Sequence, residues 1–356
     1  MNEFDDDNGL KNEYYDNDGI VETVIPEKEV FTPARDYNIL GIAMIVFYGV
    51  WNGLVLLFSY NIIKKDYFHF TVAQAALLSL ALEVAAFLPF VFILKKIKFE
   101  PLPKSEEKYG FGTYLKNVCI VFSLSVIGSI IGNIINTLIK SAGGTESKSG
   151  LVDMISGDYY IMLIFTVSFA PIFEEIMMRR MIVDRTYKYG KLKAILTSGL
   201  LFGLVHGNFE QFFYAFLIGM FFAYVYIKTG RLRHSIILHM TLNLYSMVIM
   251  FLYSQAAEAA GVGSLSQILG TNEGEIIKTL TENRDALMYL TIALIMALAE
   301  YVMAFIGVIY LLTHLNMFSL EDENQKRFPV LKTVLSPGMI ICYIALAAFI
   351  ILPAVL

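Results

Sequence analysis

Long apolar segments follow one another through most of this chain, and they constrain its fold more than any other feature. A transmembrane helix needs about 20 mostly apolar residues. Nine segments come near that length: 37–62, 71–94, 117–139, 159–184, 192–207, 210–228, 234–253, 286–313 and 337–356. Hydrophobic residues make up 56% of the 356 residues and charged residues only 17%, a balance more apolar than soluble domains carry. The sequence therefore predicts an all-α, polytopic bundle of about nine transmembrane helices.

Polar segments divide the chain into parts. Residues 1–36 are acidic and contain no apolar stretch of the signal-peptide type, so we expect a disordered tail. N-terminal transmembrane helices follow over 37–140, a core domain over 155–253, an extracytoplasmic loop over 254–285 and C-terminal helices over 286–356. The loop contains SLSQILGTNEGEIIKTL, which suits either an amphipathic helix on the membrane surface or an ordinary loop.

Lys and Arg are distributed unevenly between alternate loops. Short cytoplasmic loops are enriched in these residues. With the N-terminus inside, the cytoplasmic loops hold the six lysines of 95–116, the basic residues of 185–193 and 228–233, and those of 326–332. The other side holds only Lys64, Lys65, Lys140, Lys148, Lys278 and Arg284. We therefore expect a cytoplasmic N-terminus. The Ile-rich spans and the Asn- and Lys-containing tail are typical of bacteria, so we expect a bacterial plasma membrane.

The composition also narrows the classes of partner. A net charge of −5, with the basic residues confined to one side of the spans, argues against a nucleic-acid partner. Cys119 and Cys342 both lie in apolar segments, so we expect packing residues and neither a disulfide nor a metal-thiolate site. The lipid bilayer is the one partner that the apolar segments require.

A pair of carboxylates interrupts the fourth apolar segment. Ionisable residues at bilayer depth are costly and commonly functional. Glu175 and Arg179 are four residues apart with Glu first, which suits an ion pair on one helix face, and such a pair can be purely structural. Glu174 points about 100° away around the helix, so it is left for chemistry. Pro171 lacks an amide donor and should loosen or kink the helix just before these residues.

Two further polar motifs follow. The fifth segment ends in FGLVH, in which Gly203 and the following Gly207 allow another backbone to approach His206 closely. In the seventh segment His239 and Asn243 are four residues apart and share one helix face. A single His on an apolar face is commonly a packed core residue, but a second His with a polar companion favours a shared site.

Other polar residues of the spans receive a structural interpretation. Glu83 and Glu300 lie in the second and eighth segments, where each can line a cavity, stay protonated or pair with a neighbour.

Several catalytic classes lack their motifs, because the chain contains neither HExxH nor GxSxG and neither cysteine has a base beside it in sequence. Carboxylate and imidazole remain, and these groups activate water for hydrolysis.

The three motifs, EExxxR, FxxxH and HxxxN in that order, resemble those of the CPBP family of intramembrane proteases. This family includes the type II CAAX prenyl endopeptidases and bacterial proteins of bacteriocin processing and immunity. The similarity covers roughly residues 155–250. It implies a membrane-embedded peptidase, often labelled a metallopeptidase, that cuts a peptide bond of a membrane-associated protein or peptide.

The resemblance also implies roles for individual residues. Glu174 and His206 would polarise the attacking water, and His239 and Asn243 would stabilise the oxyanion. Glu175 and Arg179 would hold these catalytic groups in position. Asn and imidazole N–H groups can donate to an oxyanion, and loss of one such donor commonly costs ~10²–10³ in rate.

Three questions stay open in the sequence. We expect no cofactor, but Glu174, His206 and His239 also form a plausible zinc ligand set. Counting ~1.5 Å per residue from the cytoplasmic ends places His206 nearer the outer side than Glu174 and His239. A prenylated CAAX protein and a signalling or bacteriocin peptide are equally acceptable substrates.

The alternative function is a non-catalytic immunity or scaffold protein, or a proton-coupled transporter that uses its buried glutamates.

Overall fold

The computed structural model describes residues 15–16, 19–20, 32–58, 72–143, 159–261, 283–318 and 328–355. Two short strands near the N-terminus, β1 (Tyr15–Asp16) and β2 (Gly19–Ile20), pair antiparallel. The expected disorder of the 1–36 tail falls almost wholly outside the described residues. The amphipathic helix considered for the 254–285 loop also lies outside the described residues.

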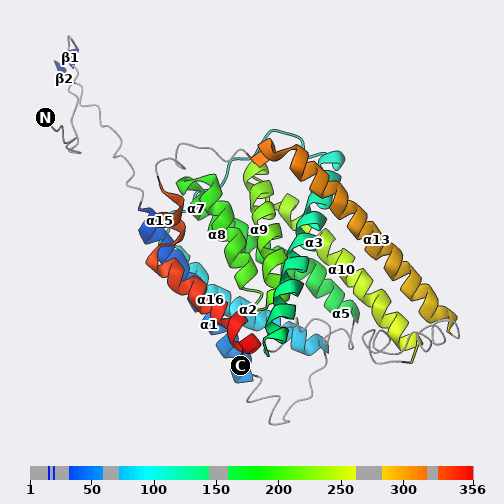
Figure 1. The fold of residues 1–356 in the computed structure, drawn as a ribbon. Coiled ribbons are helices and arrows are strands. Elements are labelled where there is room, and N and C mark those ends of the chain that lie inside the picture. Colours follow the sequence, from blue (N-terminus) through cyan, green and yellow to red (C-terminus); the bar gives the residue numbers. More distant parts are fainter. Residues whose placement is uncertain are drawn as a thin grey trace.

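Helices make up nearly all the rest of the described chain, so the predicted all-α class is confirmed (Figure 1). The long ones are α1 (Pro33–Phe58), α2 (Val72–Leu94), α3 (Phe111–Ser141), α8 (Lys191–Leu204), α9 (Phe209–Thr229), α10 (Leu232–Ala259), α13 (Arg284–Thr313) and α16 (Pro337–Val355). One continuous helical segment, Tyr159–Tyr189, precedes α8. The short helices η5 (Leu315–Phe318) and α15 (Val330–Val334) link α13 to α16.

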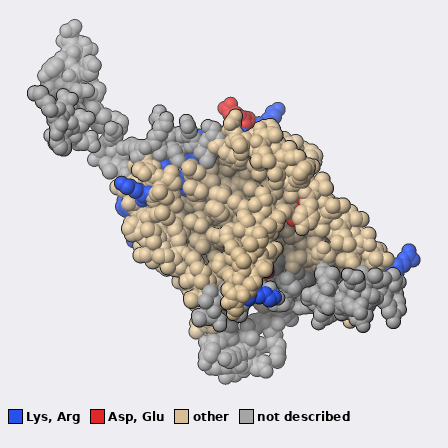
Figure 2. Space-filling model, viewed as in Figure 1, with Lys and Arg blue, Asp and Glu red and all other residues tan. Residues whose placement is uncertain are grey.

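Seven of these helical segments are long and apolar enough to cross a membrane. The count of nine is not confirmed, because α8 has only 14 residues and the apolar part of α16 only spans Pro337–Pro353. The surface agrees with a membrane environment. Large apolar side chains of α13 are exposed, among them Leu298 at 66% and Phe305 at 67%. Figure 2 shows a mostly uncharged face with charged atoms near its ends. The protein is an integral, multi-pass membrane protein.

The bundle is arranged around α8 and α9, which pack against each other along their lengths. On one side α8 meets α16, which lies along α1, and α1 packs on α2. On the other side α9 packs against α3, and α13 covers α3 and α10 at the edge of the bundle (Figure 1). Of the helices that carry the three motifs, α8 lies in the middle of the bundle, whereas α10 and the fourth span each also expose apolar side chains, such as Leu244 and Phe169.

Gly203 and Gly199 allow α8 and α9 to approach closely, as predicted for Gly203. The backbone approach predicted at Gly207 is wrong, because a Cβ atom there would meet only the Tyr48 hydroxyl, at 3.1 Å. A Cβ atom on Gly203 would lie 2.8 Å from the carbonyl oxygen of Phe212, and one on Gly199 would lie 2.9 Å from the amide nitrogen of Met220. Gly207 adopts a φ of 71°, which favours glycine, in the turn that joins the two helices. The turn places His206 after the end of α8, whereas the sequence had suggested a helix to residue 207.

The short length of α8 bears on the depth of His206. At ~1.5 Å per residue its 14 residues rise only ~21 Å, which is less than the ~30 Å hydrocarbon core. A helix of this length that begins at one membrane surface does not reach the other, so His206 need not lie near the far surface.

The fourth span changes its helical form around the carboxylates. It runs through α5 (Tyr159–Ile164), the π-helix η2 (Phe165–Phe169), α6 (Ala170–Glu175), the π-helix η3 (Ile176–Val183), α7 (Asp184–Thr186) and η4 (Tyr187–Tyr189). Pro171 stands in the first turn of α6, where its missing amide cannot continue the preceding hydrogen-bond pattern. The expected loosening before Glu174 is thus observed as a π-helical segment, a form often found at functional sites.

Candidate active site

Glu175 and Arg179 form the innermost polar contact of the site. Both side chains are 0% exposed, and the Arg179 Nε atom lies 3.0 Å from Glu175 Oε2. The Arg179 Nη2 group also donates to Glu175 Oε1 at 3.1 Å, so the pair is bidentate. The predicted ion pair on one helix face is therefore present. Its burial and double contact fix the orientation of the Glu175 carboxylate.

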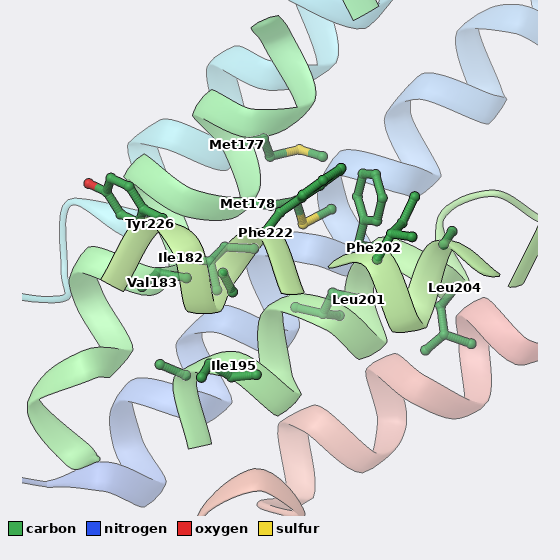
Figure 3. Packing of buried hydrophobic residues seen from close by; sticks show 14 of the residues in the cluster. Met177, Met178, Ile182, Val183, Ile195, Leu201, Phe202, Leu204, Phe222 and Tyr226 are labelled. Carbon is green, nitrogen blue, oxygen red and sulfur yellow. The ribbon is translucent and has the colours of Figure 1, made fainter. Parts of the chain in front are cut away.

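Two aromatic rings and a hydroxyl enclose this ion pair. The Arg179 guanidinium lies 5.2 Å from the ring centre of Phe202 in α8 and 5.8 Å from that of Phe222 in α9. Its Nη1 group donates to Ser198 Oγ at 2.9 Å. Figure 3 shows both aromatic residues within the buried apolar cluster. The charges are thus held away from lipid by side chains that also satisfy them.

His239 of α10 reaches both carboxylates of the fourth span. Its Nδ1 atom lies 3.3 Å from Glu175 Oε1, and its Nε2 atom lies 3.8 Å from Glu174 Oε2. An ionised carboxylate only accepts hydrogen bonds, so Nδ1 carries a proton and Nε2 faces Glu174. The imidazole also packs against Phe202 and Phe222, with ring centres 5.6 and 5.3 Å away. Residues 64 positions apart in sequence are brought together here.

Glu174 differs from Glu175 in its surroundings. Its side chain is 26% exposed, whereas that of Glu175 is fully buried. The Glu174 Oε2 atom is itself buried and has no hydrogen-bond partner among the described residues. This oxygen is consequently able to accept a proton or a hydrogen bond from a small molecule. The two adjacent glutamates thus differ both in burial and in the contacts of their carboxylates.

His206 is positioned by the turn between α8 and α9. Its Nδ1 atom lies 2.6 Å from the Phe202 carbonyl oxygen, which can only accept, so Nδ1 carries the proton and Nε2 keeps a lone pair. Asn208 fixes the turn, because its Nδ2 group donates to the His206 carbonyl at 3.0 Å while its Oδ1 accepts from the Gln211 amide at 2.9 Å. Glu174 and His239 are the ionisable groups that influence His206 electrostatically.

Asn243 lies one turn beyond His239 and faces the fourth span. Its Nδ2 group donates to the Thr166 carbonyl oxygen at 2.9 Å. Thr166 belongs to the π-helix η2, where the altered hydrogen-bond pattern makes a backbone carbonyl available to a side chain. An amide nitrogen carries two hydrogens, so a second donor remains on Asn243.

Glu83 approaches the site from α2. Phe87, one turn further along α2, packs its ring 4.9 Å from that of Phe173, the residue before Glu174. Glu83 is close enough for its charge to interact with that of Glu174. Glu300 has no comparable relation to the motif residues, because it lies on the outer helix α13.

Several supporting residues were not identified from the sequence. Ser198, Phe222 and Asn208 carry no signature of their own, although Asn208 follows Gly207 directly before a helix and fits the pattern of an N-cap. The α8 face Ser198–Phe202–His206 repeats at a spacing of four and could have indicated a common face. Nothing in the sequence marks the Thr166 carbonyl.

The zinc alternative requires Glu174, His206 and His239 to converge on one point. In the described part of the chain, no three His, Cys, Asp or Glu side chains are arranged to hold a metal ion. The His239 ring has one nitrogen directed at each glutamate.

The fold and the motifs together resemble those of multi-pass membrane peptidases of the CPBP type. Residues 156–245 match the family model described as "Type II CAAX prenyl endopeptidase Rce1-like". This segment coincides with the predicted core domain and contains all three motifs. The resemblance to the CPBP family is confirmed.

Two curated proteins share this part of the chain. "Putative membrane peptidase YdiL" of Bacillus subtilis (strain 168) is 25% identical over 167 residues, which cover 46% of this chain and 68% of the relative. "Membrane-embedded CAAX protease MroQ" of Staphylococcus aureus (strain USA300) is 25% identical over 146 residues, which cover 39% of this chain and 59% of the relative. No solved structure matches the chain.

Proposed function

We propose that this protein is an intramembrane endopeptidase that hydrolyses a peptide bond of a membrane-associated protein or peptide. One observation supports the proposal above the others. His239 faces Glu175 with one ring nitrogen and Glu174 with the other, while the Glu174 oxygen nearest to it has no other partner. Buried acceptors are normally hydrogen-bonded, so this oxygen is suited to accept from a water molecule or a substrate atom.

Glu174 and His206 activate the water in this proposal. Glu174 accepts a proton from water, and the Nε2 lone pair of His206 orients the same molecule, since its Nδ1 is engaged by the Phe202 carbonyl. The hydroxide equivalent adds to the peptide carbonyl carbon and forms a tetrahedral intermediate. The proton held by Glu174 then passes to the leaving nitrogen as the C–N bond breaks. Water is thereby divided between the two products.

His239 and Asn243 stabilise the oxyanion. In its imidazolium form His239 donates from both ring nitrogens, so that Nε2–H and the second amide hydrogen of Asn243 are one helical turn apart on the same face of α10. The Glu175–Arg179 pair holds His239 through Nδ1, and the Thr166 carbonyl holds Asn243. Both donors are therefore oriented before substrate binds, which is the condition for effective electrostatic stabilisation.

The test is cleavage of a quenched peptide library by the detergent-solubilised full chain. Glu174→Gln keeps the size of the side chain and removes its basicity, so we expect cleavage to disappear. Glu300→Gln is the matched control, because it makes the same chemical change in another span, and we expect its cleavage rate to stay within about threefold of wild type, well short of the ~10²–10⁴-fold that a positioned general base contributes. Equal cleavage by wild type and Glu174→Gln would exclude the proposed role.

A strong chelator is added in a second arm of the same experiment. The metal-free mechanism expects undiminished cleavage, whereas loss that zinc restores would replace it with a metal-dependent one. Absence of cleavage by wild type on both prenylated and unmodified peptides would favour a binding or scaffold function. Cleavage of one peptide class would identify the substrate type.

A further inference from the structure

A polar cavity lies at the end of the bundle where α3 begins and α9 ends, and none of the motif residues lines it. Its volume is about 130 Å³, well above the ~10–15 Å³ that a single water needs. Three segments form it: the connector between α2 and α3, the first two turns of α3 and the last two turns of α9. Its lining residues are Ser105, Glu107, Lys108, Tyr109, Thr113, Lys116, Asn117, Tyr224, Val225, Lys228 and Thr229.

The charges around this cavity are mainly positive. Lys108 comes from the connector, Lys116 from α3 and Lys228 from α9, so three separate segments each contribute one lysine to the lining. None of the three forms an ion pair within the described residues; Lys116 and Lys228 instead lie over the rings of Tyr310 and Tyr224, at 5.3 and 5.9 Å. Glu107 is the one acidic lining residue. Positive charge is thus in excess.

Neutral donors complete the lining. Asn117 donates to the Tyr109 hydroxyl oxygen at 2.8 Å, which leaves the Tyr109 hydrogen available to another acceptor. Thr113 stands in the first turn of α3, whose initial amides have no side-chain cap. Such amides favour negatively charged ligands. The lining therefore supplies ammonium, hydroxyl and amide donors together.

The cavity has a fixed wall. The connector is tied to α9 by a hydrogen bond from the Ser105 amide to the Thr229 carbonyl at 3.0 Å. Gly230, with a φ of 61°, lies so close to Pro103 that no side chain would fit there. These contacts hold Lys108 and Lys228 on the same side of the bundle before any ligand binds, and a preformed site loses less entropy on binding.

We propose that this cavity binds a phosphate-bearing anion at the membrane–water boundary. The cavity lies at the ends of two spans, among the aromatic rings of Tyr109, Tyr224 and Tyr310. Aromatic rings gather at the level of the lipid headgroups in membrane proteins, so the cavity lies at that level. The same donors suit the phosphate of an anionic lipid or a soluble phosphate group. Peptide hydrolysis does not depend on this site, so the two proposals are tested separately.

The experiment measures binding to the purified full chain in a neutral detergent. Probes are short-chain phosphatidylglycerol, short-chain phosphatidylcholine and inorganic phosphate, at constant ionic strength. We expect wild type to bind phosphatidylglycerol, and Lys116→Gln/Lys228→Gln to weaken this binding at least tenfold. Lys116→Arg/Lys228→Arg, which keeps both charges, should retain it. Circular dichroism of each variant confirms that the fold is intact.

Lys95→Gln/Lys96→Gln is the matched control, because it removes two exposed charges near the end of α2, outside the cavity. Unchanged lipid binding by this control supports a defined site. An equal loss in both double variants would show only a diffuse basic surface and overturn the proposal, as would equal binding of phosphatidylglycerol and phosphatidylcholine by wild type. Competition by inorganic phosphate would assign the site to a soluble phosphate, and its absence to the lipid headgroup.

Discussion

Replacement of Arg179 by methionine is the change whose effect the structure defines best. The variant keeps a long side chain between Phe202 and Phe222 but removes the charge that faces Glu175, and both partners are 0% exposed. Loss of one member of a buried ion pair costs about 3–5 kcal/mol, because the other charge remains without compensation. That corresponds to a factor of roughly 10²–10⁴ in the unfolding equilibrium.

The free energy of unfolding is measured by titration with a denaturing detergent in mixed micelles. Arg180→Met is the matched control. Arg180 is the next residue and also pairs at a spacing of four, with Asp184 at 2.8 Å, but its side chain is 42% exposed. Asp184 is itself 0% exposed, but Tyr226 still donates to it in the variant, so we expect a smaller loss than for Arg179→Met. Similar losses in the two variants would refute the reasoning.

A double variant separates stability from activity. Glu175→Leu combined with Arg179→Met replaces the pair by apolar side chains, an exchange that is often neutral for stability. We expect it to recover most of the lost free energy. Cleavage should stay impaired, because His239 Nδ1 loses its acceptor and with it a fixed orientation. Recovery of full cleavage would show that Glu175 does not position His239.

Further changes have similarly defined results. Gly203→Ala should destabilise the fold by about 1–3 kcal/mol in the same titration, since the facing backbone cannot yield, whereas Gly112→Ala meets no atom within 4 Å and should not. Ser198→Ala removes the hydroxyl that accepts from the buried guanidinium and should cost about 1–3 kcal/mol, with a lower cleavage rate. Asn243→Ala should lower kcat by ~10²–10³, as loss of an oxyanion donor does. Glu83→Gln should lower it less in the same cleavage assay, and the reverse order would show that Glu83 contributes more to catalysis than Asn243.

The sequence predicted the parts of the site that depend on local spacing. Glu175 and Arg179 were assigned to one helix face, and the structure pairs them. Helical periodicity sufficed there because both side chains belong to one helix. The number of spans was less well predicted, since hydropathy alone does not tell a 14-residue buried helix such as α8 from a helix that crosses the bilayer.

Contacts between helices could not be derived in the same way. The approach of His239 to both glutamates depends on the packing of α10 against the fourth span, which no single-helix pattern encodes. The aromatic enclosure by Phe202 and Phe222 has the same origin, because apolar residues are so frequent here that those of the site have no distinguishing signal. Polar residues are informative in such a chain because they are rare.

The π-helical segment Phe165–Phe169 gives the fourth span a tolerance for changes in length. A π-turn holds one residue more than an α-turn, so removal of one residue from this segment would restore regular pitch and still leave Glu174 and Glu175 facing His239. Removal of a residue between Glu175 and Arg179 has a different effect although that segment, η3, is also π-helical, because the deletion lies between the two partners of the ion pair and would rotate the guanidinium by about 100° away from its carboxylate. Single-residue deletions along this helix should therefore be tolerated before the glutamates and not after them.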